Sequence, residues 1–349
     1  MKEFNINNYL RKSLLSIVPY QSAREEVSFK NKNIVFLDAN ENPYQNELNR
    51  YPDPFQLELK KKIALIKKVN VNSIFLANGS DDVLGLLINA FCEPVIDSII
   101  VLPPTFGMYE VLAKINNVNV KKIPLNNEFQ LDIKSILNSV DSNIKMIFIT
   151  TPNNPTGNIV SAEDIQALLE TGVMVVLDET YYEFCKLTHL NLLSSNTNLV
   201  ILRTFSKWAG LAGLRIGFGI MDEELVNIIM AMKPPYNVSL AAEIALLASL
   251  EDQQLLMSKV DLIVSERIRM FTLLEEIKEI KLYPSVANFI LCEFKNGKGK
   301  EIYDNLCKKG IYLRYFAKPP LDDSIRISIG LPEHNDIVIA EIKTILNRS

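Results

Sequence analysis

A lysine, an arginine and two hydroxyl groups lie close together in residues 203–217, which read RTFSKWAGLAGLRIG and follow the apolar run LVIL. Glycines after Lys207 bring the backbone close, and partial desolvation of an amine lowers its pKa and makes it a Schiff-base nucleophile. Arg215 can bind a phosphate with two parallel hydrogen bonds, and Thr204 and Ser206 offer hydroxyls to the same anion. A surface lysine is the commoner alternative, but this combination favours covalent amine chemistry beside an anion site.

Two more polar groups follow apolar runs. Asp178 ends VMVVLD, and a carboxylate there is costly to bury unless it meets a cation or a strong donor. A protonated pyridine nitrogen, a magnesium ion or an arginine would each serve. Asn154 stands in NNPTG after MIFIT, where Asn, Pro and Gly make turns for purely local reasons. Its amide could instead donate to a phenolate oxygen.

Gly79, Ser80 and Asp81 follow the run SIFLAN and open an amphipathic helical pattern. Backbone N–H groups and the positive end of the helix dipole at such a start form a ready site for a phosphate. The competing interpretation is an ordinary N-cap made by the side chain of Ser80 or Asp81.

The elements that must position these groups alternate along the chain. Apolar runs within 98–115, 144–157, 172–184 and 198–220 are continuous rather than alternating, which indicates strands buried on both faces of a parallel or mixed sheet. Ligands collect at the carboxyl ends of such strands, where the polar groups above all lie. We therefore expect an α/β fold with an N-terminal arm (1–35), a large domain with a mostly parallel sheet between helices (36–235) and a small α+β domain (236–349). In the small domain, 239–280 is helical, and NFILCEF, IYLRYF and SIRISIG are strands.

Composition excludes several classes of function. The net charge of −4 provides no basic field, so a nucleic acid is not an expected partner. Two histidines are too few for a His-rich metal site or a His-based triad, and no metal is expected. Four cysteines without CxxC spacing predict free thiols in a reducing cytoplasm. Neither a signal peptide nor a run of eighteen apolar residues is present, so a soluble protein without a membrane partner is expected.

Three motifs in this order, NNPTG, DETYYEF and TFSKWAGLAGLRIG, resemble the fold-type I pyridoxal-phosphate aminotransferases over nearly the whole chain. The resemblance implies that Lys207 is the catalytic residue and holds the aldehyde of pyridoxal 5'-phosphate, while Asp178 pairs with the pyridine nitrogen. Asn154 and Tyr181 would bond the phenolic oxygen. Phe106 would stack on the ring, at a position where a tyrosine is usual. Thr180 stands where an alanine commonly packs beneath the ring in this family. The phosphate would be surrounded by Ser80, Asp81, Thr204, Ser206 and Arg215.

Finer motifs resemble the histidinol-phosphate aminotransferases: PYQSARE, LDANENPY, RYPDP, GSDDVLGLL, PPTFGMYE, YPSVANFIL and IRISIG. This resemblance implies a homodimer with shared active sites that exchanges the amino group of L-histidinol phosphate with 2-oxoglutarate, giving imidazole acetol phosphate and glutamate. Tyr20 and Tyr51 would hold the substrate phosphate, Tyr51 from the neighbouring subunit, where it also belongs to the cofactor site. Arg314 and Arg326, together with Asn154, would bind the substrate, although Arg326 could also be a solvent-side strand residue.

Other functions remain open at this stage. A threonine-phosphate decarboxylase resembles the same family and binds a phosphorylated amino substrate. A site shaped for imidazole could also accept the phenyl ring of an aromatic amino acid. A dinucleotide-dependent oxidoreductase is disfavoured because GLAGLRIG comes late and its glycines are wrongly spaced for G-x-G-x-x-G. A cofactor-free binding protein is disfavoured because Lys207, Asp178 and Arg215 occur together.

Overall fold

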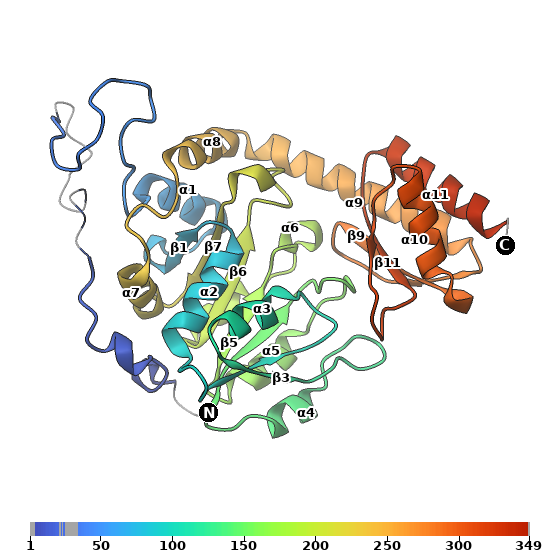
Figure 1. Ribbon diagram of the computed structural model, residues 1–349, viewed down its shortest axis with the longest axis horizontal. Coiled ribbons are helices and arrows are strands. Elements are labelled where there is room, and N and C mark those ends of the chain that lie inside the picture. The colour runs from blue at the N-terminus through green and yellow to red at the C-terminus, as the bar shows by residue number, and fades with distance from the viewer. Residues whose placement is uncertain (1–3, 21, 23, 25–33, 348–349) are drawn as a thin grey trace.

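The computed structural model describes residues 4–20, 22, 24 and 34–347. Its larger part is built on one sheet (Figure 1). In the described residues the strand order of this sheet is β1-β7-β6-β5-β4-β2-β3. Only β7 runs antiparallel to its neighbours, so the expected mostly parallel sheet is confirmed. The strands are β1 (Ile74–Ala77), β2 (Ser98–Val101), β3 (Asn119–Lys122), β4 (Ile144–Thr150), β5 (Met174–Asp178), β6 (Leu199–Thr204) and β7 (Gly217–Met221).

Helices cover both faces of this sheet. Every residue of β5 and β6 is buried, which explains why these strands are continuously apolar. One face packs on α2 (Ser80–Phe91), α3 (Met108–Ile115) and α7 (Glu223–Met232). The other face packs on α1 (Leu57–Lys67), α4 (Ile133–Asn138), α5 (Ala162–Leu169), α6 (Tyr182–Cys185) and α8 (Leu240–Glu251). Short 3-10 helices lie at Ile6–Asn8, Lys12–Leu14, Val71–Ser73, Leu190–Ser194, Ala212–Leu214 and Lys295–Gly297.

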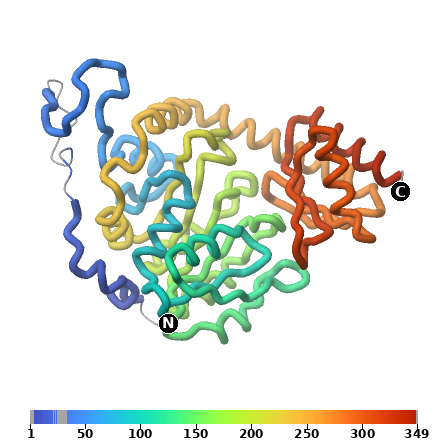
Figure 2. Tube along the Cα trace, viewed as in Figure 1, coloured from blue at the N-terminus to red at the C-terminus, as the bar shows by residue number. Residues whose placement is uncertain are grey.

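The C-terminal part is a second unit with its own core. Its antiparallel sheet has the order β10-β11-β9-β8 and contains β8 (Ile280–Tyr283), β9 (Phe289–Phe294), β10 (Arg314–Tyr315) and β11 (Ser324–Ser328). The long helix α9 (Gln253–Glu275) leads from the large unit into the small one, where α10 (Gly299–Lys308) and α11 (Pro332–Leu346) complete the core. Figure 2 shows the N-terminal segment running along the side of the large unit that lies away from this small unit.

Three details differ from the expectation. The helical region predicted over 239–280 is two helices, because the side chain of Asp252 accepts a hydrogen bond from Leu255 N at 2.9 Å and starts α9 there. The strand predicted over IYLRYF is only two residues long, since the chain then enters the segment AKPPL. The strands β3 and β8 were not predicted.

The domain boundaries at residues 35 and 235 stay predictions. Within the described residues, no helix is both long and apolar enough to span a bilayer.

Candidate active site

A cavity of about 660 Å³ opens at the carboxyl ends of the large sheet's strands. The ends of β4, β5 and β6 and the starts of α2 and α3 form its floor, and residues of β10 and β11 from the small sheet form its far wall. Nearly all residues predicted for the site line this one cavity, because parallel strands end at the same edge. They are Ser80, Asp81, Phe106, Asn154, Asp178, Tyr181, Thr204, Ser206, Lys207, Arg215, Arg314 and Arg326.

Lys207 lies in the turn that follows β6, with its side chain exposed to the open cavity. Desolvation by the surrounding protein lowers the pKa of its amine, and the positive charge of Arg326 lowers it further. Asp178 acts in the opposite direction, since its negative charge favours the ammonium form. A lowered pKa enlarges the neutral fraction of the amine at any given pH, and the neutral amine is the form that attacks carbonyl groups.

Asp178 ends β5 and is buried against the floor of the cavity. Burial raises the pKa of its carboxyl group, while hydrogen bonds from Thr180 and Tyr109 act to lower it. No lysine or arginine of the described residues forms an ion pair with Asp178. Of the alternatives that the sequence left open, an arginine partner is therefore not what the structure shows, and a cationic ligand fits the position.

The start of α2 forms the opposite end of the cavity. Its N-cap is Gly79, with φ of 87°, and neither Ser80 nor Asp81 caps the helix with its side chain, so the N-cap interpretation is wrong for both. Arg215, itself in the left-handed region with φ of 53°, reaches toward this helix start and lies 3.9 Å from the carboxylate of Asp81. Thr204 donates from its hydroxyl to Ser206 Oγ at 3.0 Å. Backbone N–H groups, a guanidinium and two hydroxyls thus surround one position, which suits a phosphate.

Two glycines make this close approach possible. A Cβ atom on Gly217, at the start of β7, would lie 2.3 Å from the backbone nitrogen of Ser80. A Cβ atom on Gly79 would lie 2.9 Å from Arg215 Nη2 and would also sit at a positive φ. The strand and the helix start can touch because Gly217 has no side chain, and the absence of a side chain on Gly79 leaves room for the guanidinium of Arg215.

Aromatic groups border the middle of the cavity. Phe106 lies just before α3, with its ring edge-on to Tyr109 at a centroid distance of 5.6 Å. Tyr181 follows β5, and burial raises the pKa of its phenol to about 12, although Arg326 acts to lower it. A phenol held neutral in this way can donate a hydrogen bond to a ligand.

Arg326 and Arg314 enter the cavity from the small sheet, where they are direct partners on neighbouring strands. Arg326 donates a hydrogen bond from Nη1 to the side-chain oxygen of Asn154. Its Nε is buried and has no hydrogen-bond partner among the described residues. Arg326 is therefore not a solvent-side residue, and its guanidinium places a positive charge at the cavity wall.

Tyr20 and Tyr51 do not reach the cavity of their own chain. Tyr20 is 76% exposed, and Tyr51 is 48% exposed and stacks on Tyr236 with ring centroids 4.3 Å apart. Three other residues of the motif PYQSARE lie outside the described residues: Gln21, Ala23 and Glu25.

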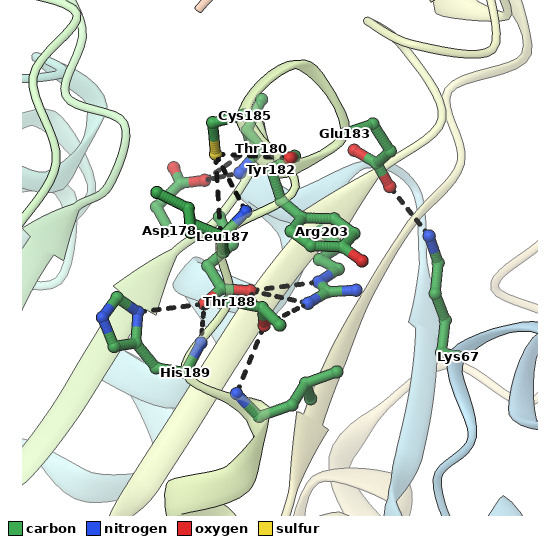
Figure 3. A network of polar contacts seen from close by, with 12 residues as sticks. Lys67, Asp178, Thr180, Tyr182, Glu183, Cys185, Leu187, Thr188, His189 and Arg203 are labelled. Carbon is green, nitrogen blue, oxygen red and sulfur yellow. Dashed lines mark hydrogen bonds and ion pairs between the residues drawn. The ribbon is translucent and has the colours of Figure 1, made fainter. Parts of the chain in front are cut away.

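Sequence reasoning missed a network of buried charges behind the cavity. Arg203 directly precedes Thr204 at the end of β6, and Glu179 directly follows Asp178 at the end of β5. Side chains alternate along extended backbone, so Arg203 and Glu179 point to the opposite face from these two site residues. Arg203 donates to Glu179 at 2.7 Å, and Thr188 and His189 join the same carboxylate (Figure 3). Burial acts to raise the pKa of Glu179, but the hydrogen bond from His189 and the charge of Arg203 lower it overall. The pair links the residue that follows β5 to the end of β6, on the face away from Asp178.

A second missed group consists of neutral hydroxyls. Tyr109, Thr150 and Thr105 connect to Asp178 by hydrogen bonds. Tyr109 lies in the first turn of α3, three residues after Phe106, and its closeness to this predicted site residue could have marked it.

Comparisons with known proteins agree with this geometry. Residues 4–342 match the family described as Aminotransferase class I and II. A histidinol-phosphate aminotransferase of Flavobacterium psychrophilum is 42% identical over 349 residues, which cover 99% of this chain and 100% of the relative. The solved histidinol-phosphate aminotransferase of Clostridium acetobutylicum is 28% identical with a TM-score of 0.80, covering 86% of this chain and 92% of that one. An L-threonine-O-3-phosphate decarboxylase of Porphyromonas gingivalis shares the fold at 24% identity, with a TM-score of 0.73 and coverage of 86% and 91%.

Proposed function

The chain belongs to the class I and II aminotransferases, which are pyridoxal-phosphate-dependent enzymes, and on this premise we propose that it transfers the amino group of L-histidinol phosphate to 2-oxoglutarate. The products would be imidazole acetol phosphate and glutamate. The observation that carries the proposal is one cavity that brings together an amine of lowered pKa, a buried carboxylate and two arginines from another sheet. Histidinol-phosphate aminotransferases of other bacteria match the chain over nearly its full length.

The residues present fit pyridoxal phosphate at three separate points. The start of α2, which no side chain caps, suits a dianionic phosphate together with Arg215, Thr204 and Ser206. Asp178, buried without a cationic partner among the described residues, matches a protonated pyridine nitrogen. Lys207 matches the aldehyde, and the segment that carries it also carries the phosphate-binding groups. We assign cofactor binding to Phe106, Asn154 and Tyr181 as well, as the resemblance implies.

When bound, pyridoxal phosphate supplies an aldehyde that condenses with amines and a protonated ring that accepts electrons from the substrate carbon. Lys207 would hold the aldehyde, and the substrate amine would take its place there. The amine of Lys207, which burial and Arg326 make less basic, would then move the proton between the substrate carbon and the cofactor carbon as general base and general acid. Asp178 would pair with the ring nitrogen and favour its protonated form. Both half-reactions use one site, so ping-pong kinetics are expected.

The residues that would bind the substrate lie on the cavity wall formed by the small sheet. Arg314 and Arg326 provide two guanidinium groups, which suit the dianionic phosphate of histidinol phosphate and also the carboxylates of 2-oxoglutarate. The charge of Arg326 already acts inside the cavity, where it lowers the pKa of Lys207.

We propose further that the enzyme is a cytoplasmic homodimer with shared active sites. Support comes from Tyr51 and Tyr20, which lie outside the cavity of their own chain and are open to contact another. In a two-fold symmetric pair each subunit would lend the same residues to the other.

One assay tests the function directly. The protein is mixed with pyridoxal phosphate, histidinol phosphate and 2-oxoglutarate, and glutamate is followed, with Lys207→Ala as the inactive control. Glutamate formation at a rate that saturates with both substrates supports the proposal. Carbon dioxide release from threonine phosphate without glutamate would assign the decarboxylase activity instead. Turnover of phenylalanine in place of histidinol phosphate would assign an aromatic aminotransferase.

A further inference from the structure

The carboxylate of Asp178 is held by three hydrogen bonds from two neutral residues. Thr180 donates to Oδ1 twice, from its backbone nitrogen at 3.1 Å and from its hydroxyl at 2.5 Å. Tyr109 donates from its phenol to Oδ2 at 3.0 Å. Figure 3 shows Thr180 bonded to Asp178 beside the turn that follows β5. Each oxygen of the carboxylate is therefore fixed by the protein before any ligand arrives.

A chain of hydroxyl groups supports the bond from Tyr109. The phenol lies 2.7 Å from Thr150 Oγ1, which in turn lies 3.0 Å from Thr105 Oγ1. Tyr109 has one proton and donates it to Asp178, so Thr150 must donate to Tyr109. The proton of Thr150 then points toward Tyr109, and the proton of Tyr109 points toward the carboxylate, so these two aligned hydrogen bonds strengthen one another. Thr105 lies beyond them and donates to Asn153 Oδ1 at 3.1 Å.

The charged and titratable groups that face Asp178 come from four elements. Tyr109 belongs to α3, Tyr181 to the turn after β5, Asp81 to the start of α2, and Lys207 to the turn after β6. Asp81 disfavours the negative charge of Asp178, and only Lys207 among these four is a cation. The phenol of Tyr109 is fully buried, and burial raises its pKa well above the usual value, so it stays a donor across the working pH range.

We propose that Tyr109 and Thr180 are positioning residues that keep the buried Asp178 ionised and thereby hold the proton on the ring nitrogen of the bound cofactor. The inference rests on the proposed function, because that nitrogen belongs to pyridoxal phosphate. Removing either donor makes Asp178 more basic, and the shared proton moves from the ring nitrogen to the carboxylate. A ring without this proton withdraws less charge from its aldehyde carbon, so the imine nitrogen formed with Lys207 becomes more basic.

The test is the absorbance of the holoprotein titrated with pH. Tyr109→Phe keeps a ring that stacks on Phe148 but lacks the hydroxyl, and Thr180→Val keeps the shape of Thr180 but lacks its hydroxyl donor. Each is expected to raise the apparent pKa of the bound chromophore by about one unit, the effect of one hydrogen bond to a charged group. Thr180→Ser restores a hydroxyl and should titrate like the parent. Tyr9→Phe removes another phenol, one that donates to Gly172 O at 2.7 Å, and should also leave the titration unchanged.

The outcomes separate this inference from the proposed function. A parent protein that gains no visible band with pyridoxal phosphate would refute the function itself. A parent with a titrating band, together with Tyr109→Phe and Thr180→Val that titrate at the same pH, would overturn the inference alone. If Tyr109→Phe does not fold, Thr180→Val against Thr180→Ser decides the question by itself.

Discussion

The guanidinium of Arg326 donates a hydrogen bond to the side-chain oxygen of Asn154, which joins the small antiparallel sheet to the carboxyl end of the large sheet. Asn154 accepts with its oxygen, so its amide nitrogen stays available as a donor. One contact therefore orients two groups at once, the amide that we assign to the cofactor and the guanidinium that we assign to the substrate.

We expect Arg326→Gln to weaken the binding of both substrates because a buried charge-assisted donor is lost. KM for histidinol phosphate and for 2-oxoglutarate should each rise by about 10- to 100-fold, with a smaller change in kcat. Steady-state kinetics with each substrate varied in turn measures this. Arg269→Gln, at an arginine of α9 that pairs with Glu266 and Asp336, is the control and should keep parental constants. An unchanged KM in Arg326→Gln would exclude this arginine as an anion anchor.

Lys207→Ala should reduce kcat by about 10³-fold or more, because the same amine holds the aldehyde and moves the proton. Glutamate formation measures the loss, and the absorbance band of the bound cofactor should change with it. Lys186→Ala provides the control, since this lysine is exposed and pairs with Asp261. Full activity in Lys207→Ala would refute the assignment of the nucleophile.

Gly217→Ala should weaken cofactor binding, because its Cβ would lie 2.3 Å from Ser80 N and would displace the start of α2. Titration of the cofactor-free protein with pyridoxal phosphate should show a Kd raised by about 10-fold or more. Gly213→Ala is matched to it, since this glycine lies in the same segment and nothing stands within 4 Å of the added Cβ. Equal Kd values for the two variants would argue against the phosphate site at this helix start.

Asp178→Asn should stabilise the cofactor-free protein above pH 4. Burial raises the folded-state pKa of Asp178 above the usual 3.8. The contribution of its carboxyl group to the free energy of unfolding is therefore complete below pH 3.8 and is lost as the pH rises through the folded-state pKa. Asparagine resembles the neutral acid and does not titrate. Thermal unfolding should therefore show a Tm advantage of the variant that grows with pH and vanishes near pH 3, while pyridoxal phosphate stabilises the parent more than the variant. A pH-independent difference would contradict the burial argument.

Mixing two inactive variants should restore activity if the sites are shared. Equal amounts of Lys207→Ala and Tyr51→Ala, exchanged through mild denaturation, would give about a quarter of the parental activity, because half the dimers are hybrids and each hybrid has one intact site. Light scattering on the same samples measures the oligomeric state. A monomer, or no recovery beyond the sum of the separate variants, would place Tyr51 outside the site.

Sequence patterns predicted the fold class because continuous apolar runs require a sheet covered on both faces, and the structure confirms it. They also predicted that Ser80, Asp178 and Lys207 share one edge, since parallel strands bring their carboxyl ends together. The family and its cofactor followed from motifs rather than from periodicity. Each of these conclusions depends on local order along the chain.

Other features depend on contacts between distant segments. Tyr109 meets Asp178 across 69 residues of sequence, and Arg326 meets Asn154 across 172. The ion pair of Arg203 with Glu179 likewise depends on the packing of β6 beside β5.

The sequence by itself determined which groups this protein has for its chemistry and at which strand ends they stand, because alternation of strands and helices is a local property. Tertiary structure alone decided that Tyr109 donates to Asp178 and how far Lys207 is desolvated. Hydrogen-bond partners and burial are set by packing between segments far apart in the chain, and such pairings leave no periodic trace in the sequence.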